Sequence, residues 1–498
     1  MAVRYRLNLF LLFISFTGCS LNTDISLNLS SSDSQSSVTC DTSISNNYGG
    51  GDGSASHPFT LCSLDHWTFF ANDSSSWGLN FKLYADLDFT GVTAANFKSI
   101  GSAVTPFTGT FNGNNFKIHN LNITESGNTL ALFKNTDSNV NISNLTLEDI
   151  TFTDDVRLSG LVLDHGNGGT LTLDNITLKN LQLSPTAKLD NGGGLIGISS
   201  GPIDISNINI NNIYFTNPGS GPSNYWGGLV GAAQDTLNIS NVSGGSITTD
   251  GSSYAYVGGL VGLAVKAATF SNVNLTNLDI TAGMSSASGL IAKSRADITI
   301  SQTHLSGSIN DGSFASGLIA QSDNSGITAN ITITDSSFDG SILSSFNAGG
   351  LITLVLNNNI SIQRSYYKGD MLNIWNGVAG GLVEQAQGIS NTISISDSYV
   401  ISNMSNLHAT NWLIAGIVGT AQGTVNISKV YYAGSLNGTA PRACFADSAS
   451  ASSFTATDSY YDSTVCTANA NKTGSITGVT GISTASLQTA TPFTNWSA

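Results

Sequence analysis

The stretch Gly193-Gly194-Leu195-Ile196-Gly197, followed after a short polar gap by Ile203-Asp204-Ile205-Ser206-Asn207, decides the fold because it recurs along most of the chain. Its Gly-Leu-aliphatic or Gly-Ile-aliphatic step begins at Gly160, Gly194, Gly228, Gly259, Gly289, Gly317, Gly350, Gly381 and Gly416. Subtracting successive numbers gives intervals from 28 residues (289 to 317) to 35 residues (381 to 416). A strand-rich repeat of about 30 residues predicts a solenoid, in which each unit buries its apolar face against its neighbours.

A second strand follows each step, and its apolar residues alternate with polar ones. Five copies align on a shared final asparagine: Val140–Asn144, Leu171–Asn175, Ile203–Asn207, Leu237–Asn241 and Ala268–Asn272. A period of two predicts strands that bury one face. The asparagine stands where the alternation changes phase, and asparagine tolerates the left-handed backbone of a bend. We therefore expect a corner there, with the amides of coils stacked about 4.8 Å apart bonding in a ladder.

The array resembles the GLUG-motif repeat family, which is named for a Gly-Leu-aliphatic-Gly core. That core occurs at Gly193–Gly197, Gly227–Gly231 and Gly258–Gly262, and the resemblance covers roughly residues 58–496. It implies an all-β fold, a right-handed parallel β-helix. Such repeats occur in bacterial surface proteins, including adhesin-like proteins and the non-catalytic part of immunoglobulin-A-cleaving metallopeptidases. Four later copies replace the closing glycine, with Ala292, Ala320, Thr353 and Glu384, and predict broader turns in the C-terminal half.

The N-terminal residues are typical of a processing signal. Two arginines precede the apolar run Leu7–Phe16, which is too short to span a bilayer as a mature helix. The run ends in Phe16-Thr17-Gly18-Cys19, which resembles a bacterial lipobox, so Cys19 is the expected lipidation site. Ser20 resembles the outer-membrane sorting pattern, which predicts a lipid-anchored, surface-exposed protein of the bacterial outer membrane. The alternative is ordinary secretion, with Cys19 lost in the cleaved peptide.

Composition and periodicity divide the chain into five segments. They are a lipoprotein signal peptide at 1–18, a flexible tether at 19–57, an N-terminal cap with the first strands at 58–125, the β-helix array at 126–470 and a closing segment at 471–498. Ser, Asn, Asp and Gly dominate the tether. In the cap, short alternating runs indicate strands, and Leu64–Asn72 is the one helix expected, capped by Ser63.

The composition excludes one class of partner. Charged residues make up 10% of the chain and the formal net charge is −15. Nucleic-acid phosphates require clustered Lys and Arg, so we expect no nucleic-acid partner. No later stretch is apolar enough to cross a membrane, and the expected contact with the membrane is the lipid on Cys19.

Four cysteines remain after Cys19. Cys40 and Cys62 flank the start of the array, and Cys444 and Cys466 flank its end. An even count in an exported protein favours disulfides, for which three pairings are possible. Pairing within each end is expected because the two pairs stand at opposite ends of a long solenoid. Metal binding is the alternative, and it is not favoured because no histidine stands at ligand spacing beside either pair.

We expect no catalytic site, no cofactor and no metal. None of the six histidines is followed by Glu, so the His-Glu-x-x-His motif of zinc peptidases is missing. Parallel β-helices also carry polysaccharide lyases and hydrolases, so carboxylate pairs matter. The candidates are Asp86 with Asp88, Asp154 with Asp155, and Asp164 with His165. Structural or solvated roles are the preferred interpretation of each.

Two positions of the repeat change residue type in the C-terminal half. The corner position becomes Gln302, Asp335, Arg364, Asp397, Lys429 and Asp458, so that five successive residues alternate in charge. Two residues later, the outward position becomes Tyr366, Tyr399, Tyr431 and Tyr460. We expect these four tyrosines to be substantially exposed in one row, as a contact surface for glycan or protein ligands. A structural covering of the coil edge is the alternative.

Three functional hypotheses follow. The first is a surface-anchored, non-enzymatic β-helical lipoprotein that acts in adhesion or in binding of glycan or protein ligands. The second is a glycan-active enzyme of the polysaccharide lyase or hydrolase type, which requires several carboxylates converging on one groove. The third is a structural spacer at the cell surface.

Overall fold

The computed structural model describes residues 40–43, 47–127, 129–154, 157–185, 191–216, 224–250, 255–324, 328–373, 377–406, 413–439, 441–472 and 475–489. Contacts divide the chain into two units, Met1–Thr39 and Cys40–Ala498, and the described residues all belong to the second. The expected signal peptide, Cys19 and the first part of the expected tether lie outside the described residues.

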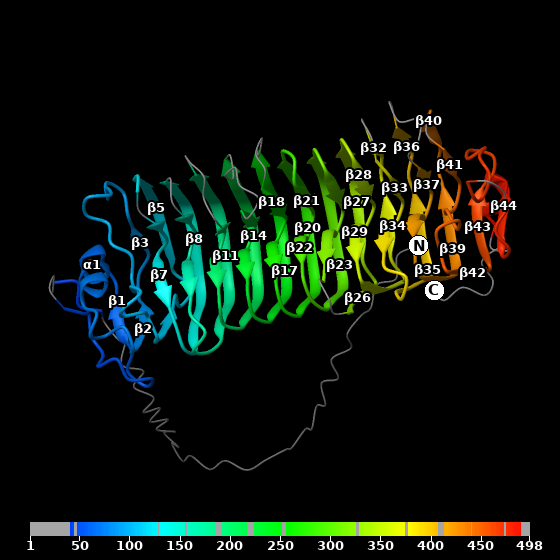
Figure 1. The fold of residues 1–498 in the computed structure, drawn as a ribbon. Coiled ribbons are helices and arrows are strands. Elements are labelled where there is room, and N and C mark those ends of the chain that lie inside the picture. The colour runs from blue at the N-terminus through cyan, green and yellow to red at the C-terminus, as the bar shows by residue number, and fades with distance from the viewer. Residues whose placement is uncertain are drawn as a thin grey trace, which may run out of the picture. The chain divides into compact units, whose positions relative to one another are not determined.

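The second unit is a β-solenoid of about 11 turns, with parallel stacked coils of about 31 residues and only 3% helix. Figure 1 shows the strands of consecutive coils side by side from the cap, marked by α1, to β44. The repeat period and the all-β parallel architecture predicted from the sequence are confirmed. Among the helices that the structure describes, none has the length and apolarity that a membrane span needs.

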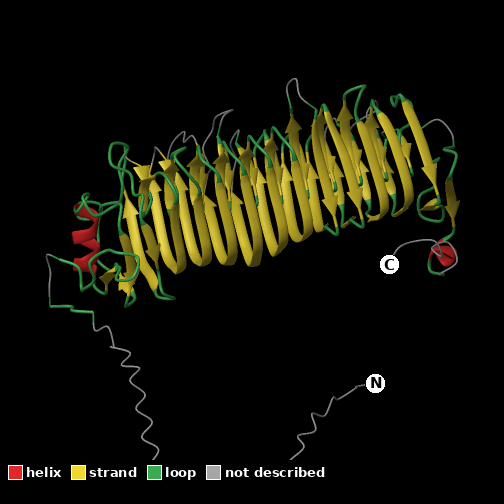
Figure 2. Cartoon of the chain, turned by 90° about the horizontal axis from the view of Figure 1, so that it is seen from below, coloured by secondary structure: helices red, strands yellow, loops and turns green. Residues whose placement is uncertain are grey.

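A sheet of long strands runs along one side of the solenoid (Figure 2). Its strands in the cap are β1 (Phe59–Leu61), β2 (Asn80–Leu83), β3 (Leu87–Asp88), β4 (Thr110–Asn112) and β5 (Lys117–Thr124). The central coils contribute β8 (Val140–Asp154), β11 (Leu171–Pro185), β14 (Ile203–Thr216), β17 (Leu237–Asp250), β20 (Ala268–Ala282) and β23 (Ile298–Asp311). The later coils contribute β26 (Ala329–Thr334), β27 (Ser337–Ser344), β30 (Asn358–Gln363), β31 (Tyr366–Lys368), β32 (Met371–Asn373), β35 (Thr392–Ile401), β36 (Met404–Asn406), β39 (Thr424–Ala433), β40 (Leu436–Gly438), β42 (Ser453–Thr457), β43 (Ser459–Asp462) and β44 (Val479–Ile482).

Two sheets of short strands complete each coil. One consists of β7 (Phe133–Thr136), β10 (Val162–His165), β13 (Ile196–Ser199), β16 (Val230–Ala233), β19 (Val261–Ala264), β22 (Ile291–Ser294), β25 (Ile319–Asp323), β29 (Ile352–Leu356), β34 (Val383–Gln387) and β38 (Val418–Ala421). The other consists of β12 (Asn191–Gly193), β15 (Tyr225–Gly227), β18 (Tyr256–Gly258), β21 (Ser286–Ser288), β24 (Phe314–Ser316), β28 (Asn347–Gly349), β33 (Ala379–Gly380), β37 (Ile414–Ala415) and β41 (Arg442–Ala443). A further pair is β6 (Thr129–Leu130) with β9 (Arg157–Leu158), and a short helix α2 (Thr484–Leu487) follows β44.

The long strands bend where the sequence predicts corners. The corner residues have φ between 46° and 57°, the left-handed region, and they are Asn144, Asn175, Asn207, Asn241, Asn272, Gln302, Asp335, Arg364, Asp397, Lys429 and Asp458. A left-handed residue other than glycine is strained by roughly 1–2 kcal/mol, and less so for Asn and Asp, which bond locally. Stacking of the coils therefore imposes the bend even where Arg364 and Lys429 occupy it.

The expected amide ladder forms along these corners. Asn175 donates to the side-chain oxygen of Asn144 at 2.8 Å, and Asn272 donates to that of Asn241 at 2.8 Å. One step departs from the pattern, because Asn207 donates to Asp174 Oδ1 at 2.7 Å. Each of these bonds joins neighbouring coils, so the ladder links the coils between Asn144 and Asn272.

One continuous core fills the solenoid. The inward residues of the long strands are fully buried, as in Leu171, Leu173 and Ile176 of β11. Each pairs in register with an apolar residue of the coils on both sides, for example Leu171 with Val140 and Ile203. Burying such a side chain stabilises the fold by roughly 1.5–3 kcal/mol.

An aromatic cap closes the first coil. Helix α1 (Leu64–Asn72) begins after Ser63, whose hydroxyl accepts a hydrogen bond from the His66 amide at 3.2 Å, as the sequence predicts. The helix buries Trp67 edge-to-face against Phe89 at 5.6 Å between ring centroids. The folded unit starts earlier than expected, at Cys40. Part of the expected tether therefore belongs to the cap, where Tyr48 stacks on Phe59 at 4.1 Å.

Glycine is required at the Gly-Leu step by a close approach of backbones. A Cβ atom added to Gly194 would overlap the carbonyl oxygen of Gly228, and one added to Gly228 would overlap that of Gly259. The same overlap repeats from coil to coil, so the first position of the Gly-Leu step has no space for a side chain. This packing explains why the step recurs so regularly in the sequence.

The closing position of the motif differs from the expectation. Ala292, Ala320, Thr353 and Glu384 lie inside β22, β25, β29 and β34 rather than in broader turns. All four are fully buried, and the Thr353 hydroxyl donates to the Ala315 carbonyl of β24 at 2.6 Å. The larger side chains therefore fill the space between the two sheets of short strands instead of widening a turn.

Glu384 is an isolated acid in this space. Its side chain is fully buried, and neither carboxyl oxygen has a hydrogen-bond partner among the described residues. Burial raises the pKa of Glu384 well above its usual value, because the charged form loses its hydration. The carboxyl group is therefore neutral over a pH range in which an exposed glutamate is ionised.

We predict that Glu384→Gln removes a pH dependence of stability. Since the pKa is higher in the folded state than in the unfolded state, wild-type stability is greatest below the unfolded pKa. It falls as the pH rises through the range between the two pKa values, by up to about 1.4 kcal/mol per pH unit. The free energy of unfolding in urea should match between wild type and variant at acidic pH, and the variant should become the more stable as the pH rises. Parallel pH curves would contradict this, and Glu125→Gln, at a partly exposed position, is the control.

Candidate functional site

Both predicted disulfides are present. Cys40 bonds to Cys62 and Cys444 to Cys466, with Cα atoms 6.2 and 5.9 Å apart. The first ties the start of the folded unit to the residue after β1, and the second encloses β42 and β43 near the other end of the stack. They brace the two ends of the solenoid, where each terminal coil has a neighbour on one side only.

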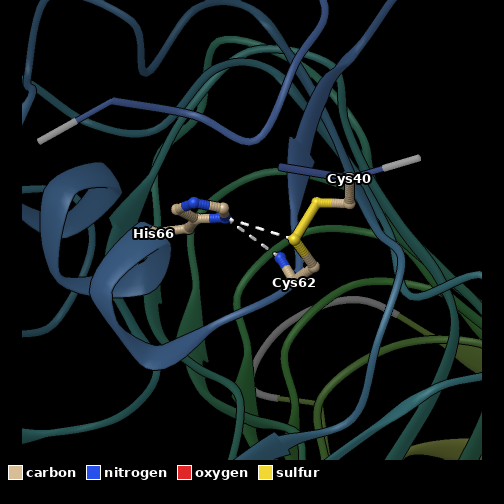
Figure 3. Close-up of side chains that lie close together, drawn as sticks. All are labelled: Cys40, Cys62 and His66. Atoms are coloured by element: carbon tan, nitrogen blue, oxygen red, sulfur yellow. Dashed lines mark hydrogen bonds between the residues drawn. A yellow bond between two sulfur atoms is a disulfide. The ribbon is translucent and has the colours of Figure 1, made fainter. Parts of the chain in front are cut away.

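A histidine lies beside the first disulfide, contrary to the expectation that none would (Figure 3). His66, in the first turn of α1, places Nδ1 3.5 Å from Cys62 Sγ, where it also accepts a hydrogen bond from the Cys62 amide at 3.3 Å. Cys40, Cys62 and His66 form the one group of three metal-binding residue types that comes together in the described part of the chain. The two sulfur atoms are bonded to each other, so neither is a thiolate that could bind a metal.

The carboxylates singled out in the sequence have structural partners. Asp88 Oδ1 accepts hydrogen bonds from Thr90 and Asn120, and these lower the pKa of Asp88 to about 2. Asp86 accepts from the Lys117 amide at 3.0 Å. Asp88 therefore stays ionised at any ordinary pH, and each aspartate ties its loop to the next coil. Neither has the environment of a general acid.

The remaining candidates do not form an acid–base site. Asp164 is held by both terminal nitrogens of Arg157, at 2.6 and 2.9 Å. His165 is buried, with Nδ1 2.9 Å from the Thr136 hydroxyl and Nε2 3.0 Å from the Gly169 carbonyl, and burial lowers its pKa. Asp154 is buried at the end of β8, and Asp155 lies outside the described residues. Asp164 and His165, although adjacent in the sequence, therefore contact different partners.

The charged corner residues pair across coils. The Arg364 guanidinium donates to both carboxylate oxygens of Asp335, at 2.6 and 2.8 Å. Lys429 Nζ lies 3.8 Å from Asp397 Oδ1. Both ion pairs were expected from the alternating charges. The Arg364–Asp335 pair lies at the surface, where such a pair contributes about 0–1 kcal/mol.

The four tyrosines form one column, as predicted. Tyr366 pairs in register with Tyr399, Tyr399 with Tyr431, and Tyr431 with Tyr460. The rings of Tyr366 and Tyr399 stack with centroids 4.6 Å apart, and those of Tyr399 and Tyr431 with centroids 5.3 Å apart. Their inward neighbours Tyr367, Val400 and Tyr432 are fully buried, and Tyr461 is half-buried.

The column is less exposed than expected, because all four outward tyrosines are half-buried. Tyr399 has both flat faces covered, by the rings of Tyr366 and Tyr431, and burial raises the pKa of Tyr366, Tyr399 and Tyr431. Stacking against a sugar requires a free ring face, which Tyr399 lacks. The structure therefore favours the covering role for this column over the role of a glycan platform.

A groove that the sequence analysis did not identify lies at the ends of five successive long strands. It has a volume of about 750 Å³ and is lined from β14, β17, β20 and β23, and from the end of β27 with the turn after it. Its walls carry Tyr214, Asp250, Asp279 and Asp311, together with threonine, serine and asparagine side chains. At about 4.8 Å per coil, the groove extends roughly 19 Å along the solenoid axis.

The register of the coils brings the three aspartates together. Asp250 pairs with Thr281, which pairs with Asn310, and Asp311 is the next residue. The three aspartates thus come from consecutive coils. Tyr214 donates from its hydroxyl to Asp250 Oδ2 at 2.8 Å, and this hydrogen bond raises the pKa of Tyr214.

Asp311 is the buried member of the group. It ends β23 with 2% of its surface exposed, and its Oδ2 accepts a hydrogen bond from the Phe314 amide at 3.3 Å. Oδ1 has no hydrogen-bond partner in the described part of the chain. Burial raises the pKa of Asp311 to about 7, although nearby backbone amides oppose the shift. Oδ1 is itself inaccessible to solvent, so Asp311 belongs to the packed end of β23 and not to the exposed surface of the groove.

The sequence did contain a signal for this groove. Asp250, Asp279 and Asp311 follow one another by 29 and 32 residues, close to the repeat period. The glycine step and the corner define the repeat in the sequence, and the far ends of the long strands share no such motif. The three aspartates line a common groove only because the coils stack in a particular register. That register cannot be counted directly from the sequence, because the coils differ in length.

Comparisons with known proteins give limited help. No family model matches the chain. A stretch of 107 residues, 21% of the chain, is 36% identical to halomucin of Haloquadratum walsbyi (strain DSM 16790 / HBSQ001). The match covers 1% of the length of halomucin, so it establishes neither a shared architecture nor a shared role.

We predict that the tyrosine column contributes to stability. Tyr399→Ala should lower the free energy of unfolding by about 1–3 kcal/mol, because it removes two aromatic stacks. Tyr399→Phe keeps both stacks and should stay within about 0.5 kcal/mol of wild type. Tyr432→Ala opens a core cavity and should lower the free energy by about 3–5 kcal/mol. Urea denaturation checks all three, and equal values for the two Tyr399 variants would refute the role of stacking.

Proposed function

We propose that the protein is a surface-anchored, non-enzymatic β-helical lipoprotein that binds glycans. The groove on the long-strand sheet is the observation that carries this proposal. It is open and extended, and it presents carboxylates, hydroxyls and an asparagine amide over five coils. Polyhydroxylated ligands are recognised by such groups in arrays, because each sugar offers several donors and acceptors.

The repeating geometry also suits a polymer. Consecutive coils present equivalent backbone positions about 4.8 Å apart along the solenoid axis. A polymer lying along the axis can therefore contact polar side chains from successive coils in turn. The lipobox at Cys19 and the resemblance to surface β-helix repeats support a location at the cell surface.

We expect the purified full chain to bind oligosaccharides on a glycan array, with longer oligomers bound more tightly than monosaccharides. Tyr214→Ala should weaken this binding at least five-fold, because Tyr214 forms part of the groove wall. Thr299→Ala, on the same sheet and outside the groove lining, is the matched control. Binding that is unaffected by Tyr214→Ala would contradict the groove. Binding of proteins alone on a parallel host-protein array would favour a protein ligand instead.

A glycan-active enzyme is the second candidate, and three carboxylates in one groove favour it. A glycosidase uses one carboxylic acid with a raised pKa and a second carboxylate that stays ionised. Asp311 has the raised pKa, and Asp279 lines the same groove. The bound oligosaccharides should remain intact after prolonged incubation if the protein only binds. Release of shorter products with new reducing ends, abolished by Asp311→Asn, would establish the enzyme.

The membrane anchor is tested separately. Cells labelled with a lipid precursor should incorporate it into the wild-type protein, because the thiol of Cys19 is the acceptor of a lipobox. Cys19→Ser should abolish the label, whereas Cys444→Ser should keep it. Equal labelling of wild type and Cys19→Ser, or no label in either, would refute the anchor.

A further inference from the structure

Three metal-binding residue types meet at the start of the folded unit. Cys40, Cys62 and His66 offer two sulfur atoms and a ring nitrogen, and these atoms all lie within 4.8 Å of one another. The two cysteines are joined as a disulfide, so the group binds no metal in this oxidised state. Reduction of the disulfide would leave two thiols and an imidazole at the same place.

The imidazole of His66 is oriented as a metal ligand would be. Its Nδ1 faces the sulfur of Cys62 at 3.5 Å (Figure 3). The same nitrogen accepts a hydrogen bond from the Cys62 amide, so it carries a lone pair. That bond is long, at 3.3 Å, and a metal ion can replace it at modest cost. Bonds of about 2.1 Å to nitrogen and about 2.3 Å to sulfur at a tetrahedral zinc ion place the two ligands roughly 3.6 Å apart. The separation of Nδ1 and Sγ already matches that value.

The surroundings keep the group open and hold its members in place. Gly49 packs so closely on Cys40 Sγ and the His66 ring that a Cβ atom at residue 49 would overlap both. The Thr60 hydroxyl lies 3.5 Å from Cys40 Sγ and can donate a hydrogen bond to a coordinated thiolate. Ser63 caps α1 and thereby fixes the turn that carries His66. Cys40 is half-buried, so solutes reach the group from its side.

The second disulfide provides a comparison within the same chain. Cys444 and Cys466 are 22 residues apart in sequence, as are Cys40 and Cys62. In the described part of the chain, no His, Asp or Glu completes a group of three with Cys444 and Cys466. Zinc sites in proteins have at least three protein ligands. Only the pair beside His66 therefore offers a site when it is reduced.

We propose that reduction of the Cys40–Cys62 disulfide converts this group into a zinc site. The two thiolates and His66 Nδ1 are the ligands, and water takes the fourth position. A dithiol reductant supplies two electrons and two protons, which break the bond between the sulfur atoms and leave two thiols, and the reductant becomes a disulfide. Zinc then displaces one proton from each thiol to solvent and accepts the lone pair of His66. The start of the folded unit is thus closed either by the disulfide or by the metal ion.

The test follows the reactivity of each cysteine in the full chain. A phosphine reduces both disulfides, taking oxygen from water to become its oxide, and leaves no competing thiol. Iodoacetamide is then added without metal, with Zn²⁺ or with Mg²⁺, and peptide mass spectrometry measures the alkylation rate at each position. We expect Zn²⁺ to slow alkylation of Cys40 and Cys62 by roughly ten-fold or more, because the metal engages the sulfur that attacks the reagent. Cys444 and Cys466 should react at unchanged rates. Mg²⁺ should protect none of them, because it prefers oxygen ligands.

A substitution tests the part played by the histidine. His66→Gln should weaken zinc binding by the reduced protein roughly ten-fold or more, as measured by competition with a chromophoric chelator. His57→Gln, in the same cap and outside the group of three, is the matched control and should leave the zinc affinity unchanged. Unchanged affinity in His66→Gln would overturn the assignment of the third ligand and with it the inference.

The wild-type measurement needs no variant and can refute the inference by itself. Equal alkylation of all four cysteines with and without Zn²⁺ would do so. Equal protection of the two pairs would also do so, because it would show that any reduced pair binds the metal. Protection of Cys40 and Cys62 should disappear in urea, since the unfolded chain does not hold the three residues together. Protection that persists in urea would likewise overturn the proposal.

Discussion

The stacking of each coil on the next in strict register is the constraint on which the rest of the structure depends. Side chains alternate along a strand, so a slip of one residue would turn the apolar face outward. The register therefore keeps Val140, Leu171 and Ile203 in one buried column. It also holds the corners in the left-handed region, even where Arg364 occupies the place of asparagine. The strain at such a corner is small beside the apolar burial and the interstrand hydrogen bonds that stacking secures.

Stacking converts every position of the repeat into a column of like positions. Amides in a column can bond to one another, as Asn241 and Asn272 do, and aromatic rings can stack, as Tyr366 and Tyr399 do. Charges in a column must alternate, and Asp335 with Arg364 meets that requirement. All of these columns meet one condition: side chains at equivalent positions of neighbouring coils, about 4.8 Å apart, must attract each other.

The same condition bears on function. A column in which each side chain is satisfied by its neighbours offers little to a ligand, which is why the tyrosine column is a poor platform. The groove differs because its aspartates come from three consecutive coils in neighbouring rather than identical positions. Asp311 lacks a donor for one oxygen within the described structure. A surface that presents polar side chains over several coils is suited to a ligand that is itself extended and repetitive.

The sequence by itself determined the period, the alternation, the corners, helix α1 after Ser63 and the braced ends, because each is a pattern in neighbouring or evenly spaced residues. The two ion pairs and the tyrosine column followed from the same alignment. Only the tertiary structure decided that the cap begins at Cys40, that His66 lies beside a disulfide and that the tyrosine rings cover one another. It also brought the residues of the groove together at the ends of the long strands. These features depend on distances between side chains about one coil apart in sequence, and the folded stack sets those distances through backbone register and the packing of buried side chains.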